Sequence, residues 1–248
     1  MIHSFLIIGQ SNMAGRGNIE NLPPITDNRL LVLRNGRWQT MYRPVNNDRP
    51  FSGFCLAETF AECYARYKNV STGIIPCADG GTCIDQWQKG SLLYDNAIYQ
   101  AKLAERTSNI AGVLWHQGEG DCTEEKYPFY EKKLTELFFN IRKDLDLYDV
   151  PFIVGGLGDV LPAFSEEYKT YLHINEALEH YANTTEMTGY ASANGLETKG
   201  DNLHFDTKSL VEFGKRYFEA FLEKEDKSKI FIEKNNSDLV SRSKLELL

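Results

Sequence analysis

The 248-residue sequence lacks the features that would place it in a membrane or on nucleic acid. None of its apolar runs approaches the ~20 residues needed to cross a bilayer. Its first ten residues, MIHSFLIIGQ, lack the basic start and the long apolar run of a secretory signal. Acidic residues outnumber basic ones by 35 to 27, so the formal charge of −8 offers no basic face to nucleic acid or anionic lipid. Uncharged small molecules are therefore the expected partners, and the sequence gives no indication of oligomeric state.

The five cysteines are an odd number and contain no C-x-x-C pair, which predicts reduced thiols in a cytoplasmic protein. Metal ligands are equally sparse. His204 has Asp201 and Asp206 beside it in the sequence, but no other cluster supplies the remaining ligands. We therefore expect neither a metal ion nor another cofactor.

Short apolar runs alternate along the chain with segments in which apolar residues recur at helical spacing. The expected strands are 3–9, 29–35, 71–78, 111–117 and 151–157, and the expected helices are 55–67, 94–108, 124–145, 165–182 and 207–224. This alternation predicts an α/β fold, a three-layer α/β/α sandwich with a central parallel sheet of about five strands. The length and the 42% hydrophobic content favour one domain over residues 1–224, followed by a C-terminal extension over 225–248.

In such sheets, ligands bind beyond the carboxyl ends of the strands. Ser11 stands at one of these ends, directly after the first apolar run in FLIIGQSNMAG. Two interpretations remain open: a nucleophile at the tip of the strand, or a serine that caps the following helix. The stretch differs from the G-x-S-x-G elbow because Met13 stands where the second glycine would be.

A serine nucleophile needs a base and a group that orients the base. Of the five histidines, His204 is the best candidate, because Asp201 precedes it by three residues in GDNLHFD. One turn can then direct both side chains to the same place, with the carboxylate on one imidazole nitrogen and the serine on the other. The alternative is a solvated loop with an acid that caps the last helix.

Two further strand ends carry donors for the oxyanion of a tetrahedral intermediate. Gly80 and Gly81, in ADGGTC, have backbone N–H groups that a ligand can approach closely, and Gln117, in WHQGEGD, has a side-chain amide. An ordinary glycine turn and a polar strand cap are the alternative interpretations.

Four blocks in this order, GQSNMAGRG, PCADGGT, WHQGEGD and GDNLHFD, resemble the SGNH/GDSL hydrolase superfamily over about residues 2–223. They are most similar to its carbohydrate esterase family 6 and sialate O-acetylesterase-like branch, which includes acetylxylan esterase-related proteins. The resemblance implies a flavodoxin-like fold and a triad of Ser11 as nucleophile, His204 as base and Asp201 as its partner. It also implies an oxyanion hole formed by the Ser11 N–H, by Gly80 or Gly81, and by Gln117 in place of the usual asparagine.

Two neighbouring residues have less certain roles in this scheme. Glu119 lies two residues after Gln117 and is the alternative to Asp201 as the acid beside His204. Asn12, next to Ser11, either supports the loop or contacts substrate.

The predicted function is a metal-independent serine esterase that removes acetyl or other small acyl groups from carbohydrate hydroxyls. The carbohydrate substrate is implied by the resemblance alone. The alternatives are an esterase or thioesterase acting on a non-carbohydrate ester, and an inactive carbohydrate-binding protein. Four aromatic residues are candidates either for a sugar-stacking wall or for core packing: Trp38, Phe51, Phe54 and Trp87.

Overall fold

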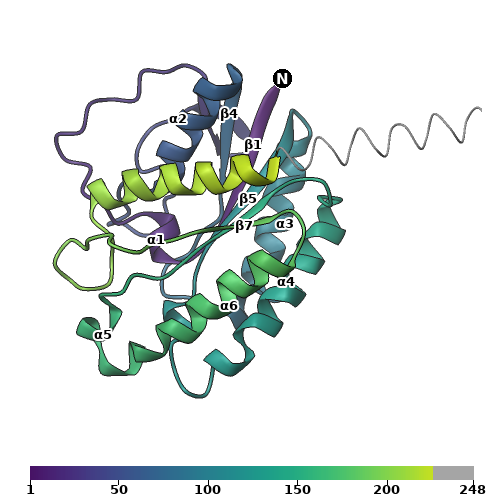
Figure 1. Ribbon diagram of the computed structural model, residues 1–248. Coiled ribbons are helices and arrows are strands. Elements are labelled where there is room, and N and C mark those ends of the chain that lie inside the picture. The colour runs from purple at the N-terminus through teal and green to yellow at the C-terminus, as the bar shows by residue number, and fades with distance from the viewer. Residues whose placement is uncertain (226–248) are drawn as a thin grey trace, which may run out of the picture.

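A seven-stranded sheet forms the middle layer of the protein, seen here in a computed structural model that describes residues 1–225 (Figure 1). In spatial order the strands are β3 (Arg37–Thr40), β2 (Leu30–Arg34), β4 (Ser71–Pro76), β1 (Ile2–Gly9), β5 (Ser108–His116), β6 (Phe152–Gly155) and β7 (Thr188–Ala191). Only β2 and β3 pair antiparallel; every other neighbouring pair is parallel. The predicted α/β fold and all five predicted strands are confirmed, and the sheet is extended at its two edges by β3 and β7.

Within residues 1–225, five long helices cover the sheet. They are α2 (Leu56–Lys68), α3 (Leu92–Glu105), α4 (Tyr130–Leu145), α6 (Tyr171–Thr184) and residues 207–225. The shorter elements are α1 (Ser11–Ala14), α5 (Leu161–Phe164) and the 3-10 turns η1 (Ile84–Trp87), η2 (Glu119–Asp121), η3 (Tyr127–Phe129) and η4 (Glu166–Thr170). Helix α4 begins six residues later than predicted, because Pro128 lies in the turn η3 that precedes it.

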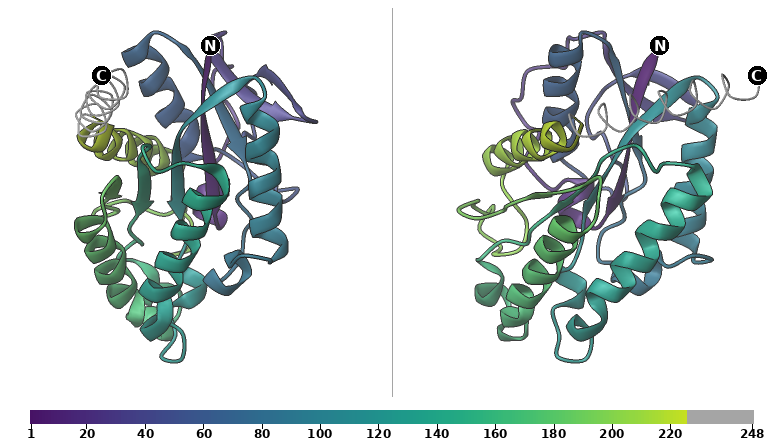
Figure 2. Two further views of the ribbon diagram at one scale, coloured as in Figure 1. Left: turned by 90° about the vertical axis from the view of Figure 1, so that its right-hand side faces the viewer. Right: turned by 45° about the vertical axis from the view of Figure 1, so that its right-hand side comes forward.

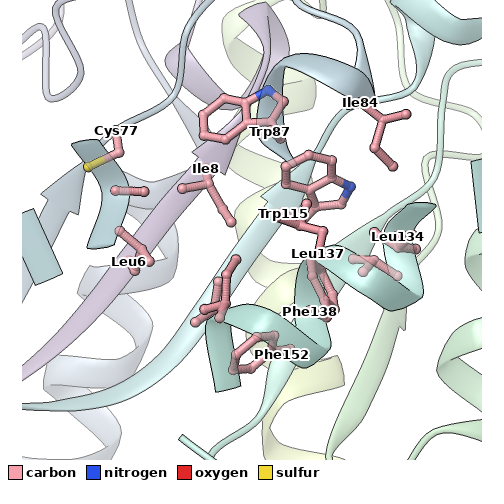
Figure 3. Packing of buried hydrophobic residues seen from close by; sticks show 14 of the residues in the cluster. Leu6, Ile8, Cys77, Ile84, Trp87, Trp115, Leu134, Leu137, Phe138 and Phe152 are labelled. Atoms are coloured by element: carbon pink, nitrogen blue, oxygen red, sulfur yellow. The ribbon is translucent and has the colours of Figure 1, made fainter. Parts of the chain in front are cut away.

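The alternation of side chains along β1 divides the core into two layers. Leu6 and Ile8 pack in one layer with residues of α3, α4 and α6, whereas Phe5 and Ile7 pack in the other with residues of α2 and of the final helix. Figure 2 shows the final helix and α2 on one side of the sheet and α3 and α4 on the other. In the first layer Trp87 and Trp115 meet edge to face, with ring centroids 5.6 Å apart (Figure 3).

The strand order also explains where a site can form. Strand β1 lies between β4 and β5, and all three run parallel, so the loops that follow them meet at one edge of the sheet. After β1 the chain forms β2, β3 and β4 on one side of that strand, and later β5, β6 and β7 on the other side. The crevice beyond the end of β1 is therefore the topological switch point, where ligands bind in such folds.

Among residues 1–225, no helix combines the length and the apolar character needed to span a membrane. The predicted C-terminal extension falls outside the described residues from position 226 onward. The cytoplasmic compartment inferred from the cysteines stays a prediction.

Candidate active site

Ser11 is the first residue of helix α1, directly beyond the end of β1. The turn from strand to helix requires Gly9, whose φ is +125° and whose missing Cβ would lie 2.1 Å from the His116 carbonyl oxygen. Gln10, not Ser11, occupies the N-cap position, so the cap interpretation of Ser11 is wrong. The Ser11 hydroxyl instead lies 3.1 Å from Nε2 of His204, and the residue is 5% exposed.

The loop between β7 and the final helix brings Asp201 and His204 together. Oδ2 of Asp201 lies 2.8 Å from Nδ1 of His204, and Oδ1 accepts backbone N–H groups from Leu203 at 3.0 Å and His204 at 2.8 Å. This is the side-chain turn that an aspartate forms with the residues two and three positions later. A backbone hydrogen bond from Lys199 to the His204 carbonyl, 2.9 Å long, closes the loop.

The carboxylate of Asp201 determines which nitrogen of the His204 imidazole carries the proton. Burial opposes its ionisation, but hydrogen bonds from the His204 backbone and imidazole and from Leu203 hold the pKa of Asp201 below its usual 3.8. An ionised carboxylate can only accept, so Nδ1 of His204 donates to it. Nε2 then has a lone pair directed at the Ser11 hydroxyl.

Asn12 joins the serine helix to the histidine loop. Its Nδ2 donates to the Leu203 carbonyl at 3.1 Å, and its Oδ1 accepts the Phe205 N–H at 3.1 Å, so it holds both neighbours of His204. The same Nδ2 donates to Oε1 of Glu119 at 2.7 Å. Asn12 therefore fixes the position of the histidine relative to the helix that presents Ser11.

Glu119 lies behind Asn12 and does not hydrogen-bond to His204. Its Oε1 contacts Asn12 and lies 3.3 Å from Nε2 of His116, with both side chains buried. Burial opposes ionisation, but His116 and Asn12 lower the pKa of the Glu119 carboxyl below its usual value. The geometry favours Asp201 as the acid that orients His204 and gives Glu119 a role in positioning Asn12.

Gly80, the first of the two candidate glycines, packs against the serine. A Cβ on Gly80 would lie 3.4 Å from Cβ of Ser11 and 2.4 Å from Nη2 of Arg16, whereas one on Gly81 would meet nothing within 4 Å. The Gly80 N–H donates to Oδ2 of Asp48 at 2.9 Å. That carboxylate also forms two hydrogen bonds with Arg16, at 2.6 and 3.0 Å. The loop after β4 is thus held beside Ser11 by a buried ion pair.

The Gln117 amide is hydrogen-bonded to residues of three loops around the site. Its Nε2 donates to Oδ2 of Asp121 at 2.6 Å, to the Thr82 carbonyl at 3.1 Å and to Oε1 of Gln10 at 3.2 Å, and the side chain is fully buried. Both amide hydrogens are therefore used within the protein. The side chain thereby joins the loops that follow β1, β4 and β5, and donation by Gln117 to an oxyanion stays a prediction.

Arg16 and Asp48 are site residues that sequence analysis did not identify. Arg16 stands inside the block GQSNMAGRG, so its proximity to Ser11 was a usable signal. Asp48 lies in NNDRP, which has no pattern that links it to a strand end. Among the residues described, no group of three or more His, Cys, Asp or Glu side chains is arranged to hold a metal ion.

A mostly parallel seven-stranded sheet with serine, histidine and aspartate hydrogen-bonded in series at its carboxyl edge defines an SGNH-type hydrolase. Residues 1–223 match the family described as carbohydrate esterase, sialic acid-specific acetylesterase, and the chain belongs to this family. It is a carboxylic ester hydrolase.

Individual relatives agree with this assignment. The chain is 29% identical to the probable carbohydrate esterase At4g34215 of Arabidopsis thaliana over 247 residues, 88% of this chain and 89% of that protein. The X-ray structure of the Arabidopsis thaliana protein AT4G34215 superposes with a TM-score of 0.80 at 26% identity, covering 89% of this chain and 98% of that one. XAC1771, a carbohydrate acetylesterase from Xanthomonas citri, shares the fold with a TM-score of 0.69 at 17% identity, over 88% of this chain and 55% of that one.

Proposed function

We propose that this protein hydrolyses acetyl esters of carbohydrate hydroxyls through an acyl-enzyme formed on Ser11. The observation that carries the proposal is the series of contacts from Ser11 to His204 at 3.1 Å and from His204 to Asp201 at 2.8 Å. A serine, a base and an orienting acid in this sequence are the parts that acyl transfer to water requires.

In the proposed reaction, Nε2 of His204 accepts the Ser11 proton while Oγ attacks the ester carbonyl carbon. The tetrahedral intermediate collapses with cleavage of the bond to the sugar oxygen, which takes the proton from His204 as the alcohol leaves. A water molecule then gives its proton to His204 and attacks the acetyl-serine, and acetate leaves as Ser11 regains a proton. Asp201 keeps the imidazole in the required tautomer and stabilises its positive charge throughout.

Two backbone groups are proposed to stabilise the oxyanion. The Ser11 N–H is at the start of α1, where the helix leaves its first N–H groups without internal partners. The second donor is proposed to come from the glycine pair after β4. Gly80 lies against the Ser11 side chain, but its N–H donates to Oδ2 of Asp48 at 2.9 Å and must leave that carboxylate to reach an oxyanion, so Gly81 remains the alternative.

The choice of an acetylated carbohydrate rests on the relatives. The curated relative is named a probable carbohydrate esterase, and the Xanthomonas citri structure is of a carbohydrate acetylesterase. An acetyl-xylooligosaccharide esterase from Geobacillus Stearmophilus has a comparable fold with a TM-score of 0.52 at 13% identity. Acetylated xylan is therefore a suitable first substrate.

The test is release of acetate from p-nitrophenyl acetate and from acetylated xylan by wild type, Ser11→Ala and Ser192→Ala. Ser192 lies exposed on the loop after β7 and serves as the matched serine control. Loss of a triad nucleophile is expected to lower kcat by about 10⁴ or more, with the control unchanged. Equal rates for wild type and Ser11→Ala would refute the mechanism, and no activity in any of the three would favour an inactive binding protein.

A further inference from the structure

We propose that a hollow lined by Arg16, Phe51 and Lys199 binds the sugar ring of the substrate and that the ring stacks on Phe51. This inference rests on the proposed function and assigns the place of its leaving group. Of the four aromatic residues considered from the sequence, Trp87 and Phe54 are buried and Trp38 packs against the core. Phe51 differs from them, since it is 69% exposed.

The hollow is lined by neighbours of the triad and not by the triad residues themselves. It has a volume of about 720 Å³, and its lining includes Arg16, Phe51 and Lys199. Nη2 of Arg16 and Cβ of Ser11 both lie near the position that a Cβ on Gly80 would take, at 2.4 and 3.4 Å. Nζ of Lys199 lies 3.8 Å from Oδ2 of Asp201. In the proposed complex the sugar ring occupies this hollow and its ester extends from there to Ser11.

Phe51 is held in place although most of its surface faces solvent. The guanidinium of Arg16 lies over the ring, 5.3 Å from its centroid, and that guanidinium is fixed by its two hydrogen bonds to Asp48. One face of the ring is thus covered by a fixed cation. Most of the remaining ring surface is exposed to solvent.

The turn that presents Phe51 is tied to the serine helix. Ser52 closes it by accepting the Arg49 N–H at 3.0 Å and by donating to Oδ1 of Asp48 at 2.7 Å. The next residue, Gly53, donates its N–H to the Gly15 carbonyl at 3.0 Å, directly after α1. The aromatic face is therefore preorganised relative to Ser11, which reduces the entropy cost of binding a ligand between them.

The composition of the hollow fits a sugar better than a lipid. A pyranose has an apolar face of C–H groups and a rim of hydroxyls, which needs one aromatic surface surrounded by donors and acceptors. Around Phe51 the lining offers Asn18, Lys199 and Asp206, with Ile19 as its other large apolar residue. An acyl chain would need apolar walls on several sides. The volume lies in the range of about 300–1,000 Å³ that is usual for small-molecule sites.

A second cavity, of about 340 Å³, is lined by Tyr148, Met187 and Lys224 among others. It lies beside the start of β7, whereas the triad lies beyond the carboxyl ends of the strands. It is therefore in the wrong place to hold a substrate of Ser11.

The test compares Phe51→Ala and Phe51→Trp with wild type on p-nitrophenyl acetate and on a panel of mono-O-acetylated methyl pyranosides. The matched control is Phe139→Ala, a change at another exposed phenylalanine, which lies on α4 and is 60% exposed. Phe51→Ala is expected to raise KM for the sugar esters about three- to tenfold, the effect of losing one aromatic contact. Phe51→Trp should retain the wild-type KM for the sugar esters, and the control Phe139→Ala should hydrolyse both kinds of substrate as wild type does.

Two results would overturn the inference while leaving the esterase mechanism intact. One is Ser11-dependent hydrolysis of p-nitrophenyl acetate with the same sugar-ester KM in Phe51→Ala and in wild type. The other is such hydrolysis by a wild-type enzyme that accepts none of the acetylated pyranosides. Absence of any Ser11-dependent hydrolysis would instead refute the proposed function on which the inference rests.

Discussion

Replacement of Asp201 by asparagine should reverse the hydrogen bond to His204 without dismantling the loop. Oδ1 of Asp201 accepts two backbone N–H groups, from Leu203 and His204. In Asp201→Asn the amide oxygen must stay on those donors, because an NH₂ group there would face two N–H groups. The NH₂ is therefore directed at Nδ1 of His204, which must become an acceptor.

The consequence is the wrong imidazole tautomer at the serine. With Nδ1 accepting, the neutral ring carries its proton on Nε2 and cannot take one from Ser11. A triad aspartate changed in this way lowers kcat by about 10⁴. The thermal unfolding midpoint should change little, since the two backbone hydrogen bonds remain.

The assay is kcat for p-nitrophenyl acetate, with Glu119→Gln measured beside Asp201→Asn. Because Glu119 contacts Asn12 and not His204, its substitution should cost far less activity. A loss below about tenfold in Asp201→Asn, or a larger loss in Glu119→Gln, would contradict the orientation argument.

Three further outcomes follow from the contacts around the site. Asp48→Ala leaves Arg16, whose side chain is 3% exposed, without its carboxylate, and should lower the free energy of unfolding by about 3–5 kcal/mol in urea titrations. Glu62→Ala, which breaks an exposed ion pair on α2, should cost under about 1 kcal/mol, and equal costs would contradict the assignment. Burial opposes ionisation of Asp48, but hydrogen bonds led by that of Arg16 hold its pKa below 3.8. The stability advantage of wild type over Asp48→Asn should therefore be fully present above pH ~4–5 and shrink as the pH falls through the lowered pKa, and an advantage that grows in acid would show the sign to be wrong. Asn12→Ala removes the hydrogen bonds to both neighbours of His204 and should lower kcat more than it changes KM, with about 1–3 kcal/mol of lost stability; an unchanged kcat would show that this connection is dispensable.

The sequence predicted the core of the sheet because its central strands are buried on both faces and read as apolar runs. The two edge strands escaped prediction, since β3 is the polar stretch RWQT and β7 is the four-residue stretch TGYA. Strands this short form because a neighbouring strand offers its hydrogen-bonding edge, and that is a tertiary effect.

The side chains that the structure brings together at Ser11 were predictable because few histidines and few strand-end serines were available. Gln117 shows the limit of that reasoning, since its position after β5 was found but the hydrogen bonds of its amide were not. Its hydrogen bonds to Thr82 and Asp121 depend on how two loops pack, which local sequence does not encode. The same holds for Asp48, which reaches Gly80 from a distant segment of the chain.

The most direct test of the central claim is to trap the acyl-enzyme. The protein is mixed with p-nitrophenyl acetate, quenched in acid within the first turnovers, digested and mapped by mass spectrometry. The account predicts one acetyl group on the peptide that contains Ser11, with none in Ser11→Ala. Turnover in wild type with the acetyl group on another residue, or with the same label in Ser11→Ala, would contradict it.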